Sequence, residues 1–178
     1  LSYTLSLHDA LPICAHPDDI ELGAGALIHN IRGQSEILCV TLSDNQKNPM
    51  LKNVVEEHRA SMAVLGVNPK DDLIESFETR KFPDMRQEVL EYLLKLRRDF
   101  KPEIIFCHSQ NDLHQDHNVI TQEALRAYRG LTVLGFDVVR SSYNFFPHFF
   151  VGVSEEDINK KIEALLKYKT YHDKYYFN

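Results

Sequence analysis

The sequence predicts a single α/β domain in which helices cover both faces of a mostly parallel sheet. Short apolar runs of strand length alternate with longer segments of helical periodicity. The apolar runs are nearly continuous, which is typical of strands buried on both faces. The 178 residues suit one domain, and the 43% hydrophobic content is enough for a sizeable core. The alternation implies right-handed crossovers and a Rossmann-like, doubly wound sheet.

The first half of the chain gives three strands and two helices. Residues 1–10 do not start with Met and do not resemble a buried strand, so we exclude them as a non-native leader and assign the domain to residues 11–178. Apolar runs predict strands at 11–14 and 36–42, and a short strand at 72–74. Helical spacing predicts helices at 20–32, before Gly33, and at 54–65, before Gly66. The polar loop 43–49 follows the second strand and is a candidate substrate wall.

The second half continues the alternation. A broad apolar face predicts a helix at 85–100, with Asp84 as its cap, and the run 102–108 predicts the next strand. A helix is expected from 117 to about 129, and the aromatic and β-branched segment 138–153 predicts one or two extended strands broken at Pro147. The last predicted helix spans 155–171, where Ser154 and Asp157 resemble a capping box.

Two clusters of His and Asp lie where apolar runs give way to helical segments. The first is Ala15-His16-Pro17-Asp18-Asp19, and the second is Asn111-Asp112-Leu113-His114-Gln115-Asp116-His117. Asp18 and Glu21 also fit a capping box, an alternative that leaves no reason for His16. Because the carboxyl ends of parallel strands meet at one edge of the sheet, the two clusters together are typical of a metal site assembled from separate loops.

The paired motifs resemble those of the PIG-L or LmbE-like family of zinc-dependent N-acetylglucosaminyl deacetylases. The resemblance extends to residues 57–67 and to 161–168, and so covers roughly residues 14 to 170. It implies an LmbE-like fold, an N-acetylated amino-sugar conjugate as substrate, and Zn²⁺ as cofactor, with Fe²⁺ as another option. Loop 43–49 departs from the family's small acidic motif, which leaves the exact substrate open. The chain ends sooner than is usual for the family, so we expect a missing C-terminal segment.

The resemblance also implies roles for the clustered residues. His16, Asp19 and His117 match the metal ligands of the family, and Asp18 matches its general base. Zinc in a hydrolase needs three such ligands and one open position, lowers the pKa of water and polarises a carbonyl. We hypothesise that His114, three residues before His117, is protonated and stabilises the oxyanion, and that Asp116 or Asp112 holds it in that state. The alternative for Asp116 is the N-cap of the following helix.

The other polar residues carry weaker expectations. His108 ends its strand close to the clusters, and either lines the site or is a buried structural histidine. His148 is a candidate substrate contact, and Arg59 either pairs with Glu56 or Asp44 or reaches the substrate. We expect four further histidines at the surface: His8, His29, His58 and His172.

Composition excludes several classes of partner. A net charge of −6 argues against nucleic acid and membrane surfaces, and no apolar stretch of about 20 residues suggests a membrane span. The three cysteines lack a C-x-x-C spacing. We expect Cys39 and Cys107 to be buried reduced thiols and Cys14 to lie near the site, in a cytoplasmic protein.

The sequence therefore predicts a zinc-dependent hydrolase that removes an acetyl group from an N-acetylglucosamine-type substrate, and homo-oligomers are compatible with it. Two alternatives stay open. One is a metal-dependent amidase acting on a non-sugar N-acyl compound, and the other is a catalytically inactive Rossmann-like binding module.

Overall fold

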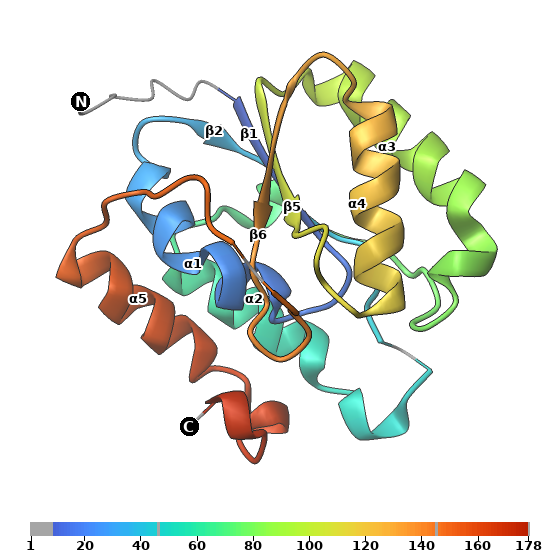
Figure 1. Cartoon of the computed structure of the whole chain (residues 1–178). Helices are drawn as coiled ribbons and strands as arrows, with labels where there is room; N and C mark the ends of the chain where they lie inside the picture. Colours follow the sequence, from blue (N-terminus) through green and yellow to red (C-terminus); the bar gives the residue numbers. More distant parts are fainter. Residues whose placement is uncertain (1–8, 46, 145, 178) are drawn as a thin grey trace.

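The structure is a computed structural model that describes residues 9–45, 47–144 and 146–177 (Figure 1). Residues 1–8 of the predicted leader lie outside the described residues. The strands run in the order β4-β3-β1-β5-β6, with β2 as a further partner of β1, and every pairing is parallel. Their bounds are β1 (Asp9–Cys14), β2 (Glu36–Ile37), β3 (Cys39–Thr41), β4 (Asp72–Ile74), β5 (Ile104–His108) and β6 (Thr132–Phe136).

Helices cover both faces of this sheet, as the sequence predicts. They are α1 (Asp19–Ile31), α2 (Val54–Val64), α3 (Arg86–Phe100), α4 (Gln115–Ala127) and α5 (Glu155–Leu165). In Figure 1, α3 and α4 lie on one side of the sheet, and α1, α2 and α5 lie on the other. Each side has its own apolar core: Leu93 and Ile120 are buried in the first, and Ile20 and Met62 in the second. Burial of these apolar faces is the main force that holds the layers together.

The strand order reverses at β1, which lies between β3 and β5. The loop that follows β1 and the loop that follows β5 therefore leave the sheet side by side at its carboxyl edge. In open α/β sheets such a switch point is where ligands bind. The two clusters found in the sequence follow these two strands.

The strands differ from the predicted ones at two places near β1. Asp9 and Ala10 belong to β1, two residues before the predicted start of the domain. The run 36–42 is divided at Leu38 into β2 and β3. Pro12 lies opposite this break, between the pairs Ala10↔Ile37 and Ile13↔Val40. Because proline has no N–H to donate, it interrupts the ladder at this point.

The prediction for residues 138–153 is wrong. The last strand is β6, which lies earlier, and the described part of 138–153 forms no strand apart from the single bridge of Ser142 with Asp112. Gly135 interrupts the apolar run of this strand, so the sequence pattern did not predict it. Glycine suits the position because a Cβ there would lie only 3.1 Å from the Cα of Ser109. Phe146 and Phe150 stay largely exposed. Aromatic and β-branched content alone therefore did not identify a strand.

The helix ends were predicted with mixed success. Ser154 and Asp157 form the expected capping box, although α5 ends at Leu165 and is followed by a 3₁₀ turn, Lys169–Tyr171. Asp84 is not the cap of α3, because it lies inside a 3₁₀ turn, Phe82–Met85. α4 begins two residues earlier than expected, at Gln115.

Two further expectations concern the chain as a whole. Cys14, Cys39 and Cys107 are all buried free thiols. Within the described part of the chain, no helix has both the length and the apolar character that a membrane span requires.

Candidate metal centre

The first cluster forms the sharp corner between β1 and α1. Asp18 occupies the N-cap position of α1 with φ of 92°, in the left-handed region, and its side chain makes no capping hydrogen bond. The capping-box alternative is therefore wrong for Asp18 and Glu21. One carboxylate oxygen of Asp18, Oδ2, is instead buried with no hydrogen-bond partner. A strained backbone and an unpartnered carboxylate are typical of a functional site rather than of a helix cap.

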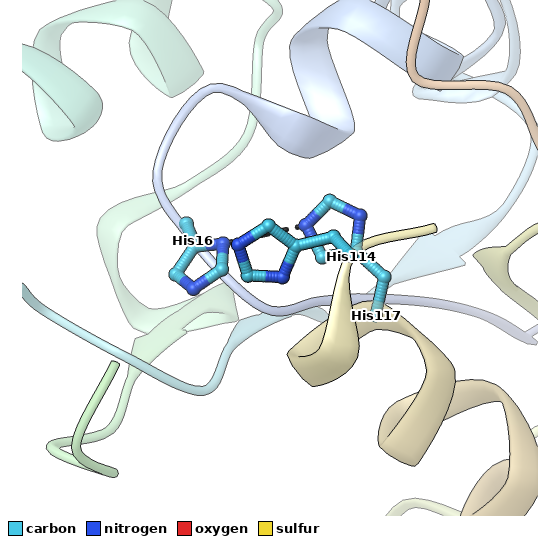
Figure 2. Close-up of side chains that lie close together, drawn as sticks. All are labelled: His16, His114 and His117. Carbon is cyan, nitrogen blue, oxygen red and sulfur yellow. Dashed lines mark hydrogen bonds between the residues drawn. The ribbon is translucent and has the colours of Figure 1, made fainter. Parts of the chain in front are cut away.

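Three donor atoms from the two clusters meet in a small triangle. His16 Nδ1 lies 3.4 Å from Asp19 Oδ2, and His117 Nε2 lies 3.2 Å from the same oxygen. The two imidazole nitrogens are 3.3 Å apart. All three side chains are buried. Figure 2 shows His16 and His117 approaching one another from separate elements, with His114 beside them.

The outer nitrogens of the two imidazoles are held by carboxylates. Asp116 Oδ2 lies 3.0 Å from His16 Nε2, and Asp112 Oδ2 lies 2.8 Å from His117 Nδ1. An ionised carboxylate can only accept a hydrogen bond, so His16 Nε2 and His117 Nδ1 carry protons and are the donors in these bonds. The inner nitrogens, His16 Nδ1 and His117 Nε2, then present lone pairs when the rings are neutral. Carboxylates in this position orient histidine ligands in metal sites.

The triangle fits a divalent ion. Two lone pairs and a carboxylate oxygen facing one another would repel without a cation between them. Tetrahedral ligands about 2.1 Å from zinc are roughly 3.4 Å apart, close to the observed separations. Without such an ion, Asp19 and Asp112 outweigh the effect of burial and raise the pKa of His117 to about 9. His16, Asp19 and His117 are thus the residues that could hold a metal.

Two neighbouring histidines also lie within range of a metal. Donor atoms of His114 lie near those of His16 and His117, and donor atoms of His108 lie near those of Asp19 and His117. His108 Nε2 already accepts the N–H of Ala15 at 3.0 Å, so its lone pair is occupied. Its ring stacks on that of His117, with centroids 3.7 Å apart, which makes it a packing partner of a site residue. His108 is buried, as the structural expectation requires, but its Nδ1 has no hydrogen-bond partner among the described residues, so it is not a fully satisfied structural histidine.

His114 is placed differently from the hypothesis. It is the N-cap of α4, and its Nδ1 accepts the backbone N–H of Asp116 at 3.2 Å. Neither Asp112 nor Asp116 holds its ring through a carboxylate, because these acids bind His117 and His16. Burial, with His117 and His16 nearby, lowers the pKa of His114 to about 4. The ring is therefore neutral with its proton on Nε2, and Asp116 is not the N-cap.

One residue of the triangle, His16, lines a cavity of about 550 Å³. Asp18, His16 and His114 line it, and burial, followed by the nearby Asp19, raises the pKa of Asp18 to about 8. Residues 43–45, 47 and 48 of the polar loop supply one wall of the cavity, and Ser43 is joined to Thr79 by a 2.8 Å hydrogen bond. The other wall holds residues that the sequence did not single out: Arg140, Tyr171 and Lys174. They follow β6 and α5, far from either motif, so no local pattern marks them.

The remaining polar residues depart from expectation. His29 and His58 are buried, not at the surface, and bind Asp157 and Asp72 respectively. Arg59 pairs with Asp72 at 2.9 Å, not with Glu56 or Asp44. His172 is exposed as expected, and His8 lies outside the described residues. His148 lines a separate cavity beside β6.

A parallel α/β sheet that carries two histidines and an aspartate around one point, beside an unpartnered carboxylate, is typical of metal-dependent hydrolases. Comparison with known proteins agrees with this class. Residues 11–128 match the family model described as PIG-L, GlcNAc-PI de-N-acetylase. The chain belongs to the PIG-L family, whose members are metal-dependent deacetylases, and the resemblance found in the sequence is confirmed.

Relatives and solved structures support the same assignment. The chain is 30% identical over 167 residues to the uncharacterized deacetylase YaiS of Escherichia coli strain K12, covering 90% of each chain. It is similar in fold to the zinc-inhibited form of the teicoplanin deacetylase Orf2, with a TM-score of 0.74 and 15% identity over 92% of this chain and 84% of that one. The N,N'-diacetylchitobiose deacetylase of Pyrococcus horikoshii gives a TM-score of 0.73 and 16% identity, covering 92% and 70%. The predicted α/β fold and enzyme class are confirmed.

Proposed function

We propose that this protein is a zinc-dependent hydrolase that removes the acetyl group from the nitrogen of an amino sugar. The observation that carries the proposal is the triangle of His16 Nδ1, Asp19 Oδ2 and His117 Nε2, which lies beside the unpartnered carboxylate of Asp18. An amino-sugar substrate is supported by the family and by neighbours named for chitobiose and teicoplanin.

The chain's own residues divide the work between them. His16, Asp19 and His117 would hold the metal, which when bound would acidify water and polarise the amide carbonyl. Asp18 is positioned to take the proton of the attacking water and to return one to the departing amine, since its carboxylate faces the cavity and is not committed to the helix. His114, donating from Nε2–H, would stabilise negative charge on the carbonyl oxygen. Asp112 and Asp116 keep the two histidine ligands oriented.

Metal analysis combined with an acetate-release assay tests the proposal. Purified protein should contain about one zinc per chain, and it should release acetate from N-acetylglucosamine conjugates faster than from simple N-acyl amines. The variant His117→Ala should lose both the metal and the activity. Turnover of simple N-acyl amines alone would favour a non-sugar amidase, and zinc-loaded protein that turns over no N-acyl compound would favour an inactive binding module.

A further inference from the structure

The two walls of the cavity differ in charge. The wall formed by residues 43–45, 47, 48 and 76–80 is polar, and within it Ser76 donates a hydrogen bond to Asp44. A second wall, which meets the first where Asn45 Nδ2 donates to the Tyr171 hydroxyl at 3.5 Å, combines two cations with aromatic rings. We call Arg140, Tyr171 and Lys174 the cationic wall, and Tyr176 contacts its Arg140.

The cations of this wall have aromatic neighbours in place of acidic partners. Lys174 Nζ lies 3.2 Å from the centroid of the Tyr171 ring. Arg140 donates from Nη1 to the Tyr176 hydroxyl at 3.2 Å, and its Nε is buried with no acceptor. Among the described residues, no carboxylate oxygen lies within 4.0 Å of a side-chain nitrogen of Arg140 or Lys174, the distance that defines an ion pair. Lys47, which lines the same cavity, is by contrast paired with Glu78 at 2.6 Å.

Acids elsewhere in the site do not neutralise the cationic wall. Asp18 and Asp19 act on Arg140 and Lys174 only at longer range. Asp19 belongs to the proposed metal site, where the ion would offset its charge. Asp18 alone then faces two cations, which leaves the wall positive. Half-buried cations without a fixed counter-ion are suited to binding an anion, because partial removal of water strengthens the attraction.

We propose that the cationic wall binds an anionic group carried by the substrate, a phosphate ester or a carboxylate, so that the enzyme selects acidic amino-sugar derivatives over neutral ones. The inference rests on the proposed function and adds the substrate class. A sugar whose acetamido group lies at Asp18 and His114 would place its hydroxyls along the wall of Ser43 and Asn45. Its anionic substituent would then lie against Arg140 and Lys174.

Equilibrium binding of deacetylated products tests this inference without requiring turnover. Calorimetry on the zinc-loaded protein would compare glucosamine, glucosamine 1-phosphate, glucosamine 6-phosphate and muramic acid. These compounds separate a neutral sugar, two phosphate esters and a carboxylate. We expect at least one acidic sugar to bind about tenfold or more tightly than glucosamine, the gain typical of a charge-assisted hydrogen bond. We also expect Lys174→Met and Arg140→Gln each to reduce that ratio to near one, and Lys174→Arg to retain it.

The matched control is Lys160→Met, which removes an equal charge from α5 and should leave the ratio unchanged, since Lys160 is paired with Glu163 at 2.8 Å. Equal binding of neutral and acidic sugars, or no binding of any acidic sugar, would overturn the inference. A preference that survives both Lys174→Met and Arg140→Gln would overturn it too, because the anion would then bind the metal alone. The proposed function is tested separately. If the wild type releases acetate from neutral N-acetylglucosamine conjugates and Asp18→Asn does not, the proposed function stands even where the anion-binding inference fails.

Discussion

Asp18 shows how far a residue pattern can be interpreted without coordinates. Its spacing from Glu21 fits a helix cap, and its position next to Asp19 fits a general base. The backbone conformation decides between these two interpretations, because a φ of 92° turns the Asp18 carboxylate away from the helix and into the cavity. That angle cannot be deduced from the sequence. Asn and Asp tolerate the left-handed region better than most residues, which makes Asn a conservative replacement here.

The variant Asp18→Asn should therefore fold, bind zinc and lose activity. Asn keeps the size and the backbone conformation but cannot take a proton from water, so we expect acetate release to fall by about 10² to 10⁴. Zinc content and the melting temperature, measured on the same preparation, are the controls. Activity within threefold of the wild type would remove Asp18 from the role of base.

His114 is the second test at the residue scale. Its Nδ1 is occupied by a backbone N–H, so its contribution is a hydrogen bond from Nε2, not a metal bond. We expect His114→Ala to keep stoichiometric zinc and to lose at least about a hundredfold in turnover, the usual effect of removing one oxyanion donor. His117→Ala is the matched comparison, because it should empty the metal site. Loss of zinc from His114→Ala would mean that ligand and catalyst are exchanged.

At the scale of elements, periodicity predicted the helices well and the strands less well. Helices α1, α2 and α3 lie within two residues of their predicted ends, because apolar spacing marks all three and a glycine follows α1 and α2. β6 was missed because a glycine required by close packing interrupts its apolar run. The start of α4 was also missed, since a histidine in place of an acid caps it. Asp116 therefore lies inside the first turn of α4, where its carboxylate contacts His16 and not His114.

One buried polar network ties several elements together behind the site. The Tyr168 hydroxyl donates a hydrogen bond of 2.5 Å to Glu21, which belongs to α1. His58 Nδ1, on α2, lies 2.8 Å from the same hydroxyl. Since the hydroxyl has given its only proton to Glu21, His58 Nδ1 must be a donor as well as Nε2, which faces Asp72 at 3.1 Å. His58 is therefore an imidazolium: Glu21 and Asp72 outweigh burial and raise its pKa from 6.5 to about 9.

Replacing His58 by Ala should destabilise the protein by about 3–5 kcal/mol, because it removes the buried cation that Glu21 and Asp72 share and leaves Glu21 with only the Tyr168 hydroxyl and Asp72 with only Arg59. The stabilisation depends on pH. The folded protein holds this proton more tightly than the unfolded chain, so the benefit is complete below pH 6.5 and is lost as the pH rises through about 9. Urea unfolding at several pH values should show the difference between wild type and variant narrowing over this interval. The exposed His172, replaced by Ala, should change nothing, and a difference that widens with pH would contradict the assignment.

At the scale of the whole molecule, the sequence predicted that two distant clusters meet, and the parallel sheet explains why. Strands β1 and β5 are neighbours and point the same way, so the loops that follow them converge. The cationic wall of the cavity could not be predicted in this way. Arg140 follows the edge strand β6, and Tyr171 and Lys174 come after the last helix. Their positions depend on how the chain packs after the sheet is complete, for which no short motif exists.

Metal binding should therefore stabilise the whole fold. His16 and Asp19 lie about a hundred residues from His117, and joining them fixes α1 against α4 across the central strands. A ligand present at about a thousandfold above its dissociation constant adds roughly 4 kcal/mol, which in a domain of this size is a melting shift of about 10 °C. Chelation should lower the melting temperature of the wild type by that order, and added zinc should restore it. His117→Ala should melt at the same temperature with and without chelator. If chelation removed the zinc and left the melting curve of the wild type unchanged, the ion could not be bridging the two clusters, and the triangle would have to be interpreted as a network of histidine and carboxylate hydrogen bonds.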